Sequence, residues 1–206
     1  MAQAELFRIH QENPQTRLVK KTVDILKRGG IIVHPTDTTY ALGVHLKNKK
    51  GIEQLYRLKR KAITRPLSLL CPDLSNISEY AQVSDSAYRI VKRLLPGAYT
   101  FILPATKAAP RITQTPRKEV GLRCPDDNIF YALSAELGLP LVSTSCSTID
   151  GELLADPDDI MRFFGHQVDL VIDAGYIYPE PSTIISLMSG YPEVLREGKG
   201  PMDDVF

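Results

Sequence analysis

No stretch of the chain is apolar over the ~18 residues that a membrane-spanning helix requires, so we expect no membrane contact. The first ten residues also lack the basic and apolar regions of an export signal. Cysteine is scarce: Cys71, Cys124 and Cys146 form no C-x-x-C pair. We therefore expect buried thiols in a cytoplasmic, reducing compartment, with no disulfide framework and no zinc site.

Several signatures of catalysis are also absent. Gly198-Lys199-Gly200 lacks the upstream glycine of a Walker A loop, and no G-x-G-x-x-G occurs. No G-x-S-x-G nucleophile elbow is present either. The histidines show no metal-ligand spacing, so we expect core or surface histidines and no tightly bound protein metal; they are His10, His34, His45 and His166.

What remains is an ordinary globular composition. The 206 residues are 43% hydrophobic and 24% charged, with a formal net charge of +1. That length suffices to bury one substantial core. No repeat, low-complexity tract or linker divides the sequence, so we expect a single domain over residues 1–206.

Hydrophobic periodicity and capping residues predict alternating helices and strands. The first helix is expected over 14–28, with Asn13 as its N-cap and Gly29-Gly30 as its end. Further helices are expected at 52–61, at 84–95 with Ser84 as its cap, at 127–138 between the cap Asp127 and Gly138, and at 156–164, where Asp156-Pro157 opens the helix. Strands are expected at 31–34, 40–46, 67–71, 99–104, 119–124, 141–145, 168–172, 183–187 and 193–196. This order predicts an α/β fold of α+β type with a twisted mixed sheet.

A basic stretch at 47–65 holds eight cations against one acid, Glu53. It is either a solvated helix surface or an anion site for nucleotide phosphates or an RNA backbone. Aromatic residues are few there, so a base-stacking platform is not predicted, whereas duplex RNA can be bound through shape and phosphates. The candidate RNA-binding residues are Lys47, Lys49, Lys50, Arg57, Arg60 and Arg65.

Two hydroxyl-rich segments and one buried cation are further candidates. The segment 35–40, Pro-Thr-Asp-Thr-Thr-Tyr, is either an ordinary turn or a polar ligand site. The segment 143–148 follows a strand, where its hydroxyls either cap the next segment or contact a ligand. Arg123 lies in an apolar strand and therefore needs a carboxylate, which is either internal or supplied by a ligand.

Eight short segments, taken in order, carry a resemblance that covers nearly the whole chain. Three are the motif at 35–43, Pro-Gly-Ala-Tyr-Thr at 96–100 and Gly-Leu-Arg-Cys-Pro at 121–125. The others lie at 29–30, 59–67, 140–145, 181–183 and 195–198. Together they resemble the YrdC/YciO family, whose best-known members are L-threonylcarbamoyladenylate synthases.

The resemblance implies a YrdC-like fold with a positively charged concave cleft, and it implies a role for each matching residue. The family's reaction joins threonine, bicarbonate and ATP into threonylcarbamoyl-AMP for tRNA modification, with Mg²⁺ assisting. Residues matching the threonine pocket are Thr36, Thr38, Tyr40 and Arg123. Residues matching the nucleotide and phosphate site are Lys59, Lys61, Ser143, Ser145, Ser147, Ser182, Thr183 and Arg196.

Two departures from the synthase pattern favour the YciO branch. The K-x-R-P element reads Lys59-Arg60-Lys61-Ala62, and Ser-x-Asn reads Ser145-Cys146-Ser147. Lysine lacks the planar fork with which arginine grips phosphate. We therefore interpret the chain as a protein that binds ATP or an AMP-type nucleotide, and structured or double-stranded RNA, without full synthase activity. The alternative is an L-threonylcarbamoyladenylate synthase that uses threonine, bicarbonate and ATP with Mg²⁺; the oligomeric state is left open.

Overall fold

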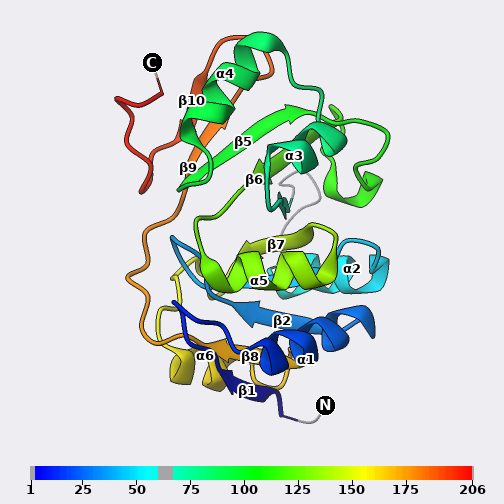
Figure 1. Cartoon of the computed structure of the whole chain (residues 1–206), viewed down its shortest axis with the longest axis vertical. Helices are drawn as coiled ribbons and strands as arrows, with labels where there is room; N and C mark the ends of the chain where they lie inside the picture. Colours follow the sequence, from blue (N-terminus) through cyan, green and yellow to red (C-terminus); the bar gives the residue numbers. More distant parts are fainter. Residues whose placement is uncertain (1–2, 60–66, 206) are drawn as a thin grey trace.

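The computed structural model of the chain describes residues 3–59 and 67–205, which build one ten-stranded sheet (Figure 1). The strands are β1 (Glu5–Arg8), β2 (Ile31–His34), β3 (Ala41–His45), β4 (Ser68–Leu70), β5 (Tyr99–Pro104), β6 (Glu119–Arg123), β7 (Leu141–Ser145), β8 (Leu170–Asp173), β9 (Thr183–Ser186) and β10 (Glu193–Arg196). The helices are α1 (Thr16–Lys27), α2 (Lys49–Leu58), α3 (Leu74–Tyr80), α4 (Asp85–Leu94), α5 (Asn128–Leu137) and α6 (Pro157–Phe164), with a 3-10 turn η1 (Arg111–Thr113).

The order of strands across the sheet is β1-β8-β2-β3-β7-β4-β6-β5-β9-β10. The sheet contains both parallel pairs, such as β4 with β6, and antiparallel pairs, such as β3 with β7, which confirms the predicted mixed sheet. The expected strands are all present within one or two residues at their ends.

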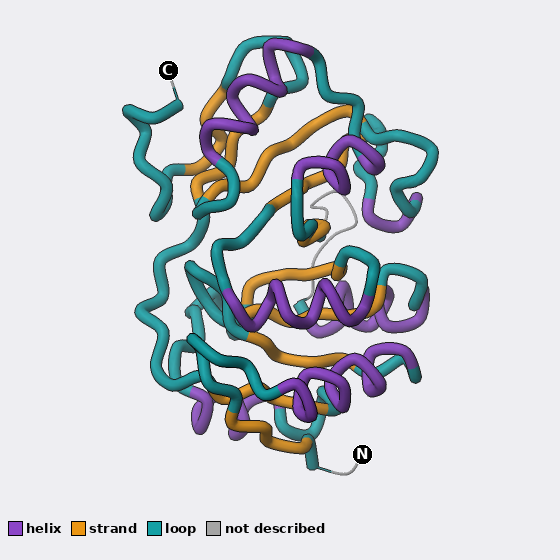
Figure 2. Tube along the Cα trace, in the orientation of Figure 1, coloured by secondary structure: helices purple, strands orange, loops and turns teal. Residues whose placement is uncertain are grey.

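Helices pack on both faces of the sheet and bury two apolar clusters. On one face, Val23 and Leu26 of α1 and Phe130 and Leu133 of α5 pack against Ile32 of β2. Figures 1 and 2 show α1 and α5 side by side over the lower part of the sheet. The larger cluster takes its helical residues from α2, α3, α4 and α6. Cys71, Cys124 and Cys146 are free and buried, as expected.

Side-chain caps fix the helices that border the site. Asp127 accepts a hydrogen bond from the backbone N of Phe130 at 2.7 Å and begins α5, which ends at Gly138 with φ of 70°. Asp156 caps α6 in the same way through the N of Asp158 at 2.8 Å. These caps were predicted from the sequence and are confirmed.

Two predicted helix starts are wrong, and two elements were not predicted. The first helix begins at Thr16 rather than at 14, and Gln15, not Asn13, holds the N-cap position without a side-chain cap. The next helix, α2, begins at Lys49 instead of 52, because Asn48 accepts a hydrogen bond from Gly51 N at 2.9 Å. Strand β1 and helix α3 were not predicted at all. Among the described residues, no helix is long and apolar enough to cross a membrane.

Candidate functional site

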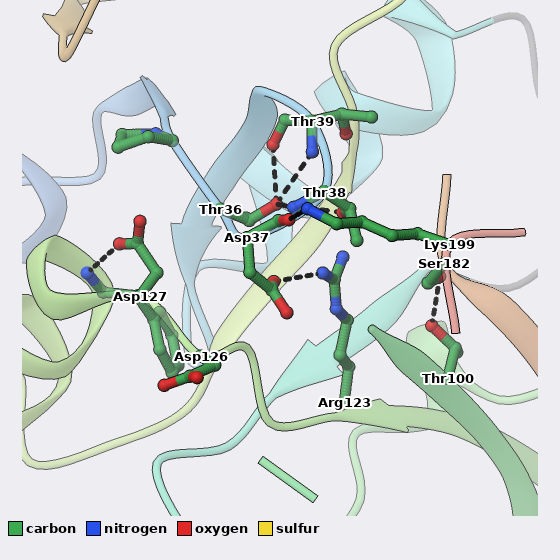
Figure 3. A network of polar contacts seen from close by, with 12 residues as sticks. Thr36, Asp37, Thr38, Thr39, Thr100, Arg123, Asp126, Asp127, Ser182 and Lys199 are labelled. Atoms are coloured by element: carbon green, nitrogen blue, oxygen red, sulfur yellow. Dashed lines mark hydrogen bonds and ion pairs between the residues drawn. The ribbon is translucent and has the colours of Figure 1, made fainter. Parts of the chain in front are cut away.

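The turn at 35–40 joins β2 to β3 and is stabilised by its own hydroxyls. Thr36 Oγ1 donates to the carbonyl of Thr39 at 2.6 Å and accepts from the backbone N of Thr38 and of Thr39, each at 3.2 Å. Thr36, Thr38 and Thr39 are all buried. Figure 3 shows how this network presents Asp37 toward β6. The segment is thus a self-bonded turn that fixes the direction of one carboxylate.

Arg123, at the end of β6, donates from Nη2 to Asp37 Oδ1 in a buried ion pair (Figure 3). The side chains are only 9% and 13% exposed. Arg123 thus has an internal carboxylate as its partner, and its predicted contact with the carboxylate of threonine is untested. Burial lowers the pKa of Arg123, while Asp37 opposes that shift. Within the described residues, the Nε of Arg123 has no hydrogen-bond partner.

A second carboxylate, Asp127, belongs to the same neighbourhood. Burial raises the pKa of Asp127 to about 6, the bond from Phe130 N opposes this rise, and the negative charge of Asp37 adds to it. The nearby positive charge of Arg123 lowers the same pKa. From the sequence, Asp127 is predicted only as a helix cap, because Asp37 is distant along the chain and their proximity depends on the fold.

The residues predicted to close the far side of a nucleotide do gather. Arg196 donates through Nε and Nη2 to the carbonyl of Ser182 at 3.2 and 2.6 Å. The hydroxyl of Ser182 lies 2.8 Å from Thr100 Oγ1, and Thr183 Oγ1 donates to Gly200 O at 2.7 Å. The C-terminal segment is thereby fastened to the start of β9.

Lys199 joins this group to the turn at 35–40, because its Nζ donates to the carbonyl of Asp37 at 2.5 Å (Figure 3). Its backbone N donates to Pro181 O at 2.8 Å. The preceding Gly198 leaves no room for a side chain, since a Cβ there would lie 2.0 Å from the carbonyl oxygen of Pro181. In the sequence, Lys199 carries no signal beyond Gly198-Lys199-Gly200, which does not fit a Walker A loop.

Lys59 and Ser147 form a second polar contact, bordering the same turn. Lys59 Nζ donates to both the carbonyl oxygen of Ser147, at 2.8 Å, and its Oγ. Ser147 follows β7, and the neighbouring Cys146 N donates to Tyr40 O at 2.8 Å. The structure therefore brings Lys59, Ser147 and the 35–40 turn together.

The floor between these groups consists of small side chains in one register across the sheet. Gly43 of β3 pairs with Ser143 of β7, Ser143 pairs with Ser68 of β4, and Ser68 pairs with Gly121 of β6. Ser145 lies one step along β7, on the same face as Ser143. The space above Gly43 is occupied by the ring of His34, from which a Cβ at Gly43 would lie 3.0 Å. The positively charged cleft that the resemblance implies stays a prediction.

Tyr40 has its hydroxyl engaged with the protein. The hydroxyl donates to Gly175 O at 2.7 Å and accepts from Ala174 N at 3.0 Å. Burial raises the pKa of Tyr40 above its ordinary value. Its predicted contact with threonine, like that of Thr36 and Thr38, is untested.

The predicted RNA-binding residues lie on or just before α2. Lys47, Lys49, Lys50 and Arg57 are all exposed. Among the described residues, these four side chains form one ion pair, between Lys49 and Glu53 at 4.0 Å. Arg60, Lys61 and Arg65 lie outside the described residues.

The structure adds a second basic segment that the sequence analysis overlooked. The loop at 105–118 packs on α2, where Tyr56 OH donates to Ile112 O at 3.0 Å. This loop contains four exposed cations and no acid; they are Lys107, Arg111, Arg117 and Lys118. The signal was present as an acid-free run, but only the packing places it beside the stretch at 47–59.

Among the residues that the structure describes, no three His, Cys, Asp or Glu side chains gather as a metal site. The site therefore consists of a buried Arg–Asp pair, a buried carboxyl group with a raised pKa, several hydroxyls and the two lysines Lys59 and Lys199. Such a set can neutralise and orient an anion.

Comparison with known proteins assigns this arrangement to a class. The Sua5/YciO/YrdC family model, described as telomere recombination, matches residues 24–198, so the chain belongs to that family. It is 41% identical to YciO of Escherichia coli over 199 residues, covering 96% of this chain and 97% of that one. The crystal structure of E. coli YciO superposes with a TM-score of 0.94 over 98% of this chain and all of YciO, at 39% identity. The predicted family and fold are confirmed.

Two further relatives carry informative names. A protein of Methanocaldococcus jannaschii, named a putative threonylcarbamoyl-AMP synthase, is 33% identical over 203 residues, covering 96% of this chain and 95% of that one. The crystal structure of P. abyssi Sua5 complexed with L-threonine gives a TM-score of 0.90 at 21% identity, over 97% of this chain and 59% of that one. At that identity the second likeness shows the fold alone.

Proposed function

We propose that the chain binds an adenine nucleotide, ATP or AMP, beside the turn at 35–40, without turnover as a synthase. The observation that carries this proposal is that Arg123 and Lys199 both contact Asp37 of this hydroxyl-rich turn. Two more cations bind hydroxyl-bearing residues: Arg196 donates to Ser182 and Lys59 to Ser147. Cations and hydroxyls are the groups that hold phosphates. The three buried thiols support a cytoplasmic location.

The basic face of α2 is proposed to bind structured or double-stranded RNA, tRNA included. The four exposed cations of the 47–57 stretch and the four of the 105–118 loop supply phosphate contacts from two neighbouring elements. Duplex RNA is recognised mainly by its shape, its 2′-hydroxyls and its phosphates, so no aromatic platform is needed.

Magnesium would enter this site with ATP. Among the described residues, no three acidic, histidine or cysteine side chains gather as a metal site. Mg²⁺ commonly binds through the phosphates of its nucleotide and one or two carboxylates. Asp37 and Asp127 are the carboxylates available, and bound Mg²⁺ would neutralise phosphate charge.

A second candidate function is L-threonylcarbamoyladenylate synthesis. The name of the M. jannaschii relative favours it. In that reaction the carboxylate of N-carboxythreonine, formed from threonine and bicarbonate, attacks the α-phosphate of ATP and pyrophosphate leaves. Against it stands Ser147, which replaces the asparagine of the synthases and whose hydroxyl and carbonyl both bind Lys59.

Two measurements on the pure protein separate these functions. A thermal-shift series with ATP, AMP and threonine in the presence of Mg²⁺ should show a higher melting temperature with the nucleotides, because a native-state ligand stabilises the fold. Incubation with ATP, threonine and bicarbonate should release no threonine-dependent pyrophosphate. Release of pyrophosphate would establish the synthase, and no shift with either nucleotide would refute the proposed site.

RNA binding has its own test. The affinity for a duplex should fall steeply as salt rises, since bound cations are released from the RNA. Reversing Lys49, Lys50 and Arg57 to glutamate should abolish binding. The matched control reverses the exposed Arg17, Lys20 and Lys21 of α1 and should keep most of the affinity. Equal affinity in both triple variants would disprove the assignment of this face.

A further inference from the structure

A groove lies beside the lysines of α2, on a part of the molecule that the nucleotide proposal does not use. It has a volume of about 510 Å³ and lies between the start of α2, the end of α3 and the 108–112 segment. Its floor is apolar, with side chains of Leu46, Ile52, Ile112 and Leu139. Its size is that of small-molecule sites, which span roughly 300–1,000 Å³.

The walls of this groove are held by specific hydrogen bonds. Tyr56 OH donates to Ile112 O at 3.0 Å, which fixes the loop on α2. Thr106 Oγ1 donates to Glu79 O at 2.6 Å, which fixes the same loop on α3. Gln114 Nε2 donates to Ala109 O at 2.7 Å and closes the loop on itself. The groove is therefore formed before any ligand arrives.

The rim of the groove is positively charged. Lys47, Lys49 and Arg111 line it, and Glu79 is the one carboxylate that does. Lys47 and Arg111 form no ion pair with any described residue. The groove is also continuous with the proposed RNA face, because Lys47 and Lys49 belong to both.

An apolar floor beneath three cations matches the chemistry of a nucleotide. A base offers flat apolar faces, and its neighbouring phosphates carry negative charge. The backbone of a perfect duplex offers charge but no exposed base face, so it would leave the floor uncovered. A purely apolar ligand would gain nothing from the lysines.

From this match we propose that the groove holds one unpaired nucleotide of an RNA, whose flanking phosphates bind Lys47, Lys49 and Arg111. The inference rests on the RNA binding proposed above. The planar guanidinium of Arg111 can stack on the base. The carboxylate of Glu79 can accept a hydrogen bond from an exocyclic amine, so cytosine or adenine is preferred over uracil.

The experiment compares two RNA hairpins of equal length, one fully paired and one with a single bulged adenosine, by fluorescence anisotropy. The native protein should bind the bulged hairpin about fivefold more tightly or better, the scale expected when one base gains a stacking partner. Ala108 lines the groove and is exposed, so Ala108→Trp fills the groove without disturbing the core. This variant should reduce the preference to within about twofold while leaving the affinity for the paired hairpin unchanged.

Two further variants complete the test. Ser75→Trp, on an exposed position of α3 outside the groove lining, should keep the preference for the bulge. Glu79→Gln should reduce the preference for bulged adenosine over bulged uridine. Binding of both hairpins with equal affinity, or a preference that survives Ala108→Trp, overturns this inference alone. Failure to bind either hairpin overturns the proposed RNA function as well.

Discussion

Replacing Arg123 by methionine tests whether the Arg123–Asp37 pair stabilises the fold. Methionine keeps most of the length of the side chain and removes its charge, so the change isolates the electrostatic contact. Removing one partner of a buried ion pair costs about 3–5 kcal/mol, because the other charge stays in a poorly hydrated place. The Asp37 side chain is 13% exposed and therefore keeps some contact with water, so we expect the lower value, about 3 kcal/mol.

For a chain of 206 residues, each kcal/mol lowers the melting temperature by roughly 2–4 °C, so Arg123→Met should lower it by about 6–12 °C. Asp37→Ala should cost at least as much, because a guanidinium does not give up its proton. Urea unfolding followed by circular dichroism gives the free energies. The double variant should cost less than the sum of the two single changes by about 1 kcal/mol or more.

The matched control is Arg8→Met. Arg8 also pairs with a carboxylate, Asp173, at 3.1 Å, but its side chain is 86% exposed. Exposed pairs contribute about 0–1 kcal/mol, so this change should lower the free energy of unfolding by no more than that. If Arg123→Met and Arg8→Met cost the same, or if Arg123 and Asp37 prove additive, then the pair at β6 is not what holds the turn in place.

Two further predictions concern groups beside this pair. The pKa of Asp127 is raised from 3.8 to about 6, so the folded protein binds a proton more readily than the unfolded chain, and stability should fall as the pH rises from about 4 to 6. Asp127→Asn keeps a capping side chain and should remove that fall in urea unfolding at several pH values; an unchanged pH profile would contradict the shifted carboxyl. Lys199→Ala should weaken ATP binding by about 5- to 30-fold, as the loss of one charge-assisted contact predicts, when measured by calorimetry. The exposed Lys107→Ala serves as its control, and equal affinities in the two variants would remove Lys199 from the site.

The predictable part of the fold is the part whose signals are local. The caps at Ser84, Asp127 and Asp156 and the glycine at 138 are each confirmed by the structure. Strand β1 was not predicted because its residues are largely exposed and show no apolar alternation. In the structure it pairs with β8. Helix α3 escaped because it has only seven residues.

The residues of the candidate site also differ in whether the local sequence reveals them. Arg123 was found because a charge in an apolar strand needs a partner, but its partner Asp37 is 86 residues away in sequence. Residues such as Lys199 and Asp127 reach the site only through tertiary packing, so no motif announces them. The order and spacing of the short motifs therefore predicted which segments contribute residues to the candidate site. The contacts between those segments could be identified only from the folded structure.

The position of β1 at one edge of the sheet has a consequence for how the chain acquires its structure. Its partner strand is β8, and Arg8 contacts Asp173 across a separation of 165 residues. During translation, β1 therefore stays unpaired until the residues of β8 have been synthesised. Such distant pairings slow folding, because the long intervening loop has to close first. We expect refolding experiments to find β1 docking late, and deletion of its residues to leave the central strands assembled.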